Sequence, residues 1–124
     1  MFDSIKKLTT KFGIGKKGIL QRYIDTFTKN KLDADESLLA CAAPNKPTEL
    51  LFVTDKRVFY YVMGTEDTTN DRIISYDQIE SCEIQSESQQ TELIVNLHTS
   101  KVQINQVEMD VAIKVKKLID SQIS

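Results

Sequence analysis

Residues 38–104 hold short runs of apolar and β-branched side chains that turn residues interrupt, and the clearest runs place apolar side chains at every second position. Residues 91–98 show the pattern clearly, because Leu93, Val95 and Leu97 fall on one side of an extended chain. Alternation of this kind is typical of a strand with one buried face. About seven such runs follow one another with short connections. This spacing favours an antiparallel sheet that bends into a sandwich or barrel over a parallel sheet with crossover helices.

Both ends of the chain have helical period instead. The pattern predicts helices over residues 3–12 and 19–31 and a closing helix over residues 107–119. Asn105 followed three residues later by Glu108 resembles a capping box, which predicts where the closing helix starts. The expected fold is therefore mainly β within the α+β class: a bent antiparallel seven-stranded sheet or barrel, capped by a C-terminal helix, with two additional N-terminal helices.

The 124 residues suffice for one hydrophobic core, and no apolar run is long enough for a membrane-spanning helix. The first residues lack the continuous apolar stretch of a secretory signal. Cys41 and Cys82 are isolated in the sequence and do not form a disulfide framework. These features together predict a cytoplasmic protein.

A net charge of −2 conceals a division of the chain. Residues 1–31 hold eight basic and two acidic side chains, a charge of +6, whereas residues 32–124 hold eight basic and sixteen acidic ones, a charge of −8. We therefore divide the chain into a basic N-terminal helical arm, residues 1–31, and an acidic β-domain, residues 32–124. The arm is attracted either to an anionic surface or to the acidic part of the same protein.

Side chains that carry catalysis or bind metals are scarce. His98 is the only histidine, so metal sites built on histidine pairs lack a second ligand, and a histidine-based triad is poorly supplied. A Cys82–His98 pair is conceivable, but both residues fit better as ordinary strand residues. Residues 13–18 spell G-x-G-x-x-G but follow a predicted helix, whereas a dinucleotide site requires a preceding strand. We expect no enzyme activity, no catalytic residues, no metal and no cofactor.

The segment Phe52-Val53-Thr54-Asp55-Lys56-Arg57-Val58-Phe59-Tyr60 resembles a motif of the bacterial pleckstrin-homology-like (PH-like) domains: a strand, a Thr-Asp-Lys-Arg turn and an apolar strand. Residues 74–81, Ile-Ser-Tyr-Asp-Gln-Ile-Glu-Ser, look like a second signature of that family. Leu38 and Leu39 after Asp35-Glu36 match its acidic lead-in to the first strand. The resemblance covers about residues 32–123.

Membership of that family implies a PH-like, strongly bent seven-stranded antiparallel sheet with a C-terminal helix. It also implies a non-catalytic binding or assembly module, some members being ring-like homo-oligomers. The turn residues Thr54, Asp55, Lys56 and Arg57 are expected to be structural, through local hydrogen bonds. Specific phosphoinositide binding is not expected, because the loop between the first two strands offers only Lys46.

The leading hypothesis for function is a protein-binding module that associates with copies of itself. The alternative is a peripheral membrane adaptor that docks on anionic lipid through the N-terminal arm. Nucleic acid is disfavoured because the β-domain is acidic and the arm has few aromatic side chains. The candidate contact residues for membrane or partner are Phe2, Ile5, Lys6, Lys7, Leu8, Lys11, Phe12, Lys16 and Lys17.

Overall fold

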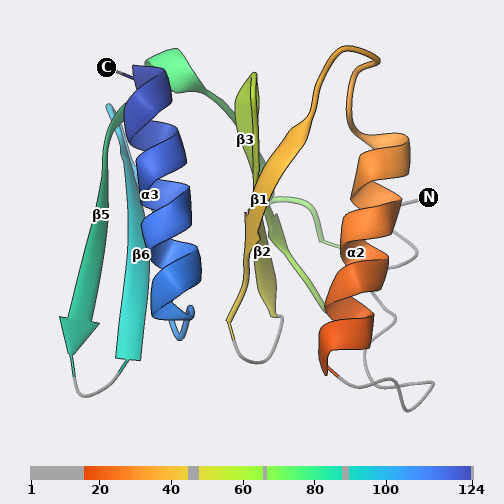
Figure 1. Cartoon of the computed structure of the whole chain (residues 1–124), viewed down its shortest axis with the longest axis horizontal. Helices are drawn as coiled ribbons and strands as arrows, with labels where there is room; N and C mark the ends of the chain where they lie inside the picture. The colour runs from red at the N-terminus through yellow and green to blue at the C-terminus, as the bar shows by residue number, and fades with distance from the viewer. Residues whose placement is uncertain (1–15, 45–47, 66, 88–89, 124) are drawn as a thin grey trace.

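The computed structural model describes residues 16–44, 48–65, 67–87 and 90–123 (Figure 1). The helix predicted over residues 3–12 lies outside these ranges. The described helices are α2 (Lys16–Asn30) and α3 (Met109–Ile123), and a 3-10 turn covers Tyr76–Gln78. The strands are β1 (Leu38–Ala42), β2 (Glu49–Thr54), β3 (Arg57–Val62), β4 (Arg72–Ser75), β5 (Ile79–Glu87), β6 (Gln90–Leu97) and β7 (Lys101–Ile104).

The seven strands form two antiparallel sheets. The first sheet has the order β1-β2-β3-β4 and the second has the order β5-β6-β7. Seven strands and a C-terminal helix are confirmed, but the single continuous sheet or closed barrel of the prediction is not formed by the described residues. The break lies at the 3-10 turn, where the Ser75 N–H donates to the side-chain Oε1 of Gln78 (3.0 Å). This tight turn redirects the chain, so that β5 starts the second sheet and does not pair with β4.

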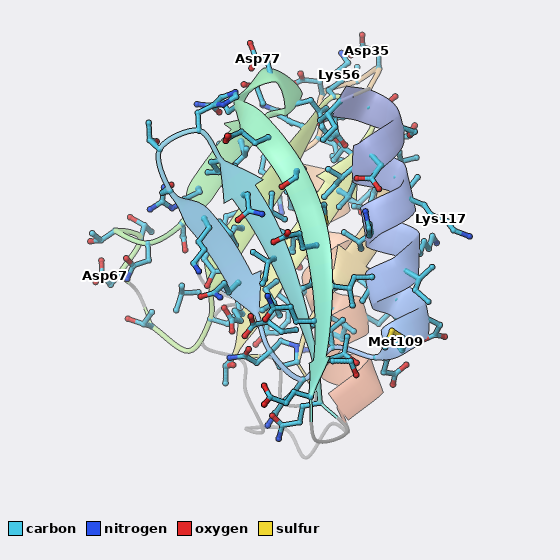
Figure 2. All side chains as sticks on the ribbon, turned by 90° about the vertical axis from the view of Figure 1, so that its left-hand side faces the viewer. Asp35, Lys56, Asp67, Asp77, Met109 and Lys117 are labelled. Carbon is cyan, nitrogen blue, oxygen red and sulfur yellow. The ribbon has the colours of Figure 1, made fainter. Side chains whose placement is uncertain are left out.

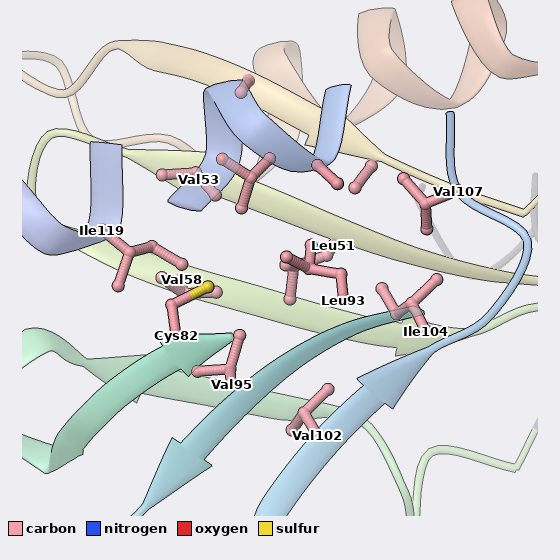
Figure 3. Packing of buried hydrophobic residues seen from close by; sticks show 14 of the residues in the cluster. Leu51, Val53, Val58, Cys82, Leu93, Val95, Val102, Ile104, Val107 and Ile119 are labelled. Carbon is pink, nitrogen blue, oxygen red and sulfur yellow. The ribbon is translucent and has the colours of Figure 1, made fainter. Parts of the chain in front are cut away.

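The main hydrophobic core lies between the two sheets and α3. Figure 3 shows Leu51 and Val58 from the first sheet approaching Leu93 and Val95 from the second, with Ile119 of α3 beside them. All five side chains are buried. Each large apolar side chain transferred from water contributes roughly 1.5–3 kcal/mol. The closing helix therefore stabilises the packing of the two sheets.

Helix α2 covers the opposite face of the first sheet (Figure 1). Its Tyr23 and Phe27 are 1% and 0% exposed. The Phe27 ring stacks on Phe52 with a centroid distance of 3.9 Å and meets Phe59 edge-on at 4.8 Å. With α2 on one side and the main core on the other, residues 50–54 of β2 are all fully buried. This explains why β2 reads as a continuous apolar run rather than an alternating one.

The start of α3 differs from the prediction. The helix begins at Met109, and Asn105 and Glu108 do not cap a helix that starts at residue 107. Instead, Gln106 has a φ of 60° and the N–H of Val107 donates to the carbonyl of Thr91 (3.1 Å). Val107 is buried in the main core. A turn that ties the end of β7 to β6 thus replaces the predicted first turn of the helix.

Candidate protein-binding surface

The Thr54-Asp55-Lys56-Arg57 turn joins β2 to β3 and is held to the segment between α2 and β1. The Oγ1 of Thr54 accepts hydrogen bonds from the N–H groups of Lys56 (3.1 Å) and Arg57 (3.0 Å). A carboxylate oxygen of Asp55 accepts one from the N–H of Ser37 (3.0 Å). The ammonium of Lys56 lies 2.6 Å from the carboxylate of Asp35, and Figure 2 shows these two side chains at one end of the molecule.

Arg57 binds Glu36, a residue that the sequence analysis placed only in an acidic lead-in. The Glu36 side chain is 0% exposed and accepts hydrogen bonds from Nε (3.0 Å) and Nη2 (2.8 Å) of Arg57. The hydroxyl of Thr54 also donates to it (2.6 Å). The Arg57 hydrogen bonds, followed by the Thr54 bond, lower the pKa of Glu36 to about 2 against the opposing effect of burial. The Arg57 guanidinium is thus already bound by a carboxylate of the same protein.

The predicted contact residues of the N-terminal arm are not brought together by described contacts. Seven of them precede residue 16 and lie outside the described residues. Lys16 and Lys17 open α2. Further along this helix, its apolar side chains pack on the first sheet. Lys46, the single basic residue of the β1–β2 loop, also lies outside the described residues.

Cys82 and His98 do not form a pair. Cys82 is 2% exposed within the main core, and burial raises the pKa of its thiol to about 12. His98 is exposed after β6, with Nε2 3.1 Å from the carbonyl oxygen of Asp77. Within the described part of the chain, no group of three or more His, Cys, Asp or Glu side chains could hold a metal ion. In the same residues, no helix has the length and hydropathy required to cross a membrane.

The outer edge of β4 is the strongest candidate for a binding surface. β4 pairs with β3 on one side, and no described strand lies on the other. Ile73 in β4 is 63% exposed, the most exposed of the large apolar side chains described. Two isoleucines in succession in the sequence carry the signal, because alternation sends Ile74 into the core and leaves Ile73 on the other face. Sequence reasoning missed this residue.

The backbone of Ile73 points to the open edge. The N–H of Met63 donates to the carbonyl of Thr48 (2.8 Å), and alternation from this bond directs the backbone of Phe59 toward β2. Phe59 faces Ile73 across β3 and β4. The N–H and C=O of Ile73 therefore point away from β3. The Ser75 N–H, two residues along, agrees with this direction because it bonds the Gln78 side chain.

A cleft of about 330 Å³ adjoins this edge. Its walls are residues 72–74 of β4, Gln78 and residues 97–100 around the β6–β7 turn. The Nη1 of Arg72 lies 3.5 Å from the hydroxyl of Ser100, so the guanidinium reaches across from the first sheet to the second. Arg72 and His98 are the only residues of the lining with a cationic form, and none of the eight lining residues is acidic.

A second cavity, of about 220 Å³, lies at the other end of the second sheet. It is lined by polar side chains of the β5–β6 hairpin and the β7–α3 connection, including Glu87 and Glu92. It has no exposed large apolar side chain in its lining. The β4 edge differs because it combines open backbone groups, an exposed apolar side chain and a cationic cleft.

Comparison with solved structures supports the fold. A DUF1696 family protein with a pleckstrin-homology domain from Shewanella loihica aligns with a TM-score of 0.57 and 14% identity, over 85% of this chain and 97% of that one. A pleckstrin homology domain from Shewanella amazonensis aligns with a TM-score of 0.56 and 14% identity, over 84% and 97%. No curated protein matches the sequence. The sequence matches the bacterial PH domain family over residues 28–121, and the chain belongs to that family.

Proposed function

We propose that the chain is a non-catalytic protein-binding module that accepts an extended polypeptide segment along the open edge of β4. The single observation that carries this proposal is that Ile73 combines an exposed side chain with backbone groups that point away from β3, at the edge of the sheet. Unpaired strand edges are templates for another strand, and main-chain hydrogen bonds supply affinity in this mode of recognition. β4 contains no lysine or proline, and its one charged side chain, Arg72, reaches toward the second sheet.

Self-association is the homotypic form of the same binding. Two copies of β4 would pair antiparallel about a two-fold axis, with Ile73 facing its counterpart. The expected result in light scattering at tens of micromolar is a wild-type dimer or larger species. Ile73→Lys places a charge on the open edge and should shift the chain toward the monomer.

Ile113→Lys is the matched control for the light-scattering experiment. Ile113 is 40% exposed on α3, so the substitution also introduces a lysine at an exposed isoleucine but leaves β4 unchanged. The Ile113→Lys chain should retain the wild-type oligomeric state in light scattering. A strictly monomeric wild-type chain would contradict self-association, and dissociation by the control alone would place the contact on α3.

The N-terminal sequence favours a second candidate, a peripheral membrane adaptor. Phe2, Ile5, Leu8 and Phe12 alternate with lysines at helical spacing in the first twelve residues. Co-sedimentation with anionic vesicles should compare the full chain with a chain that lacks residues 1–15. This deletion spares Tyr23 and Phe27 of α2, which belong to the packed structure. Equal recovery of both chains would reject the membrane proposal.

A further inference from the structure

We propose that the cleft beside β4 receives a carboxylate of the added segment, so that the preferred partner is an extended acidic peptide from another protein. This inference rests on the proposed function, because the peptide must first pair with β4. It adds the chemistry that selects the partner.

A strand added to β4 would alternate its side chains in register with those of β4. The added residue opposite Ile73 points to the same face as Ile73 and covers that exposed side chain. Its two neighbours lie opposite Arg72 and Ile74. These two residues face the second sheet, because Ile74 belongs to the core between the sheets and Arg72 approaches Ser100. The two neighbours of the central residue therefore point toward the cleft.

The cleft offers hydrogen-bond donors to an anionic side chain. The guanidinium of Arg72 is exposed and its one described hydrogen bond is the long contact to Ser100, at 3.5 Å. Thr99 and Ser100 line the same space. A guanidinium binds carboxylates through paired, charge-assisted hydrogen bonds. A glutamate side chain opposite Arg72 or Ile74 thus meets the Arg72 cation, with the Ser100 hydroxyl 3.5 Å from its Nη1.

Charges around the cleft leave Arg72 as the residue that selects the carboxylate. Both ring nitrogens of His98 lie near groups of the protein itself. Nε2 is 3.1 Å from the carbonyl oxygen of Asp77, and Nδ1 is 3.9 Å from a carboxylate oxygen of Glu80. The adjacent Asp71 directs a carboxylate oxygen to the N–H of Val62 (3.0 Å). These carboxylates are outside the lining of the cleft.

A second copy of β4 does not supply the missing carboxylate. When two β4 strands pair about Ile73, Arg72 of one copy lies opposite Ile74 of the other, and both inward positions are filled by arginine and isoleucine. The two Arg72 guanidinium groups would also approach one another. Charge complementarity therefore makes an acidic segment of a different sequence the tighter-binding occupant of this edge, and self-pairing of β4 the weaker one.

A titration with two matched peptides tests the proposal. The probes are the capped pentapeptide Val-Glu-Val-Glu-Val and its twin with glutamine in place of glutamate, added to the ¹⁵N-labelled full chain. Amide chemical shifts of β4 should change with both peptides, and the glutamate peptide should bind roughly fivefold more tightly. The preference should disappear in Arg72→Gln. It should persist in Lys101→Gln, which removes an equal charge from exposed Lys101 on β7, outside the cleft lining.

The outcomes separate the two levels of the proposal. Equal binding of both peptides at β4 would reject the acidic partner and leave strand addition standing. A preference that survives in Arg72→Gln would likewise reject the assigned role of Arg72. If neither peptide shifts the β4 amides, both strand addition and the acidic partner are rejected. Ile73→Pro removes one outward N–H that the ladder with β3 does not use, and should abolish binding of both peptides.

Discussion

The carboxylate of Glu36 and the guanidinium of Arg57 form a two-point contact, at 2.8 and 3.0 Å, between the start of the β-domain and the β2–β3 turn. The pair is asymmetric, because the Glu36 side chain is 0% exposed and the Arg57 side chain is 27% exposed. The Arg57 guanidinium also lies 4.7 Å from the centroid of the Phe59 ring. These contacts link the Thr54-Asp55-Lys56-Arg57 turn to the segment just before β1 and to the face of the first sheet that α2 covers.

Glu36→Gln should destabilise the fold, because it removes the charge that the Arg57 guanidinium binds and replaces one hydrogen-bond acceptor with a donor. We expect the free energy of unfolding to fall by about 2 kcal/mol in urea titrations. Asp35→Asn is the control, because it removes an exposed carboxylate from the Lys56 pair and should leave the unfolding midpoint nearly unchanged. Equal effects of the two substitutions would contradict the assigned importance of the buried pair.

Acidification should weaken the same contact. The folded-state pKa of Glu36 is lowered from its ordinary 4.5 to about 2, chiefly by the Arg57 hydrogen bonds. Its contribution to stability is therefore fully present above about pH 4.5 and is lost as the pH falls from 4.5 toward 2. Urea midpoints measured across this window should fall more steeply for the wild-type chain than for Glu36→Gln. Parallel pH profiles of the two chains would refute the assignment.

Much of this fold follows from local patterns in the sequence. Short apolar runs, some of them alternating, and the turn residues between them predict the seven strands, and helical period predicts α2 and α3. The division into two sheets could not be predicted from the strands alone. The chain leaves the first sheet at the 3-10 turn Tyr76–Gln78, where the Ser75 N–H donates to the Gln78 side chain, and alternation within the strands carries no signal for which strands pair. The same limit applies to Gln106, whose positive φ removes the predicted first turn of the closing helix.

The candidate site was less predictable than the fold. The charge division at residue 31 places the candidate contact residues in the arm, but α2 uses its apolar face to pack on the first sheet. Only three lysines and one aspartate precede residue 16, so most of the positive charge of residues 1–31 belongs to α2 and the residue that follows it. Ile73 could not be identified from the sequence as a site residue. Alternation shows that one of two neighbouring isoleucines points outward, but it does not show which strand lies at the edge of a sheet.

Neither cysteine should react with alkylating reagents in the folded chain at neutral pH. Burial raises the pKa of both thiols, Cys41 and Cys82, to about 12, and the thiolate is the reactive form. Intact mass after maleimide treatment should show no adduct until denaturant is added, when both thiols react. Ser86→Cys, at an exposed position on β5, provides a positive control that should react at once. Rapid native labelling of Cys82 would contradict its place in the core.

Phe27→Ala should show that α2 is an integral part of the domain. The substitution removes a fully buried ring that stacks on Phe52 and contacts Phe59, and leaves a cavity between α2 and the first sheet. We expect a loss of about 3–5 kcal/mol in the free energy of unfolding, a large part of a typical total of about 5–15 kcal/mol. Lys29→Ala, at an exposed position of the same helix, should have little effect on urea unfolding. A near-wild-type midpoint for Phe27→Ala would mean that the packing of α2 on the first sheet contributes little to the stability of the domain.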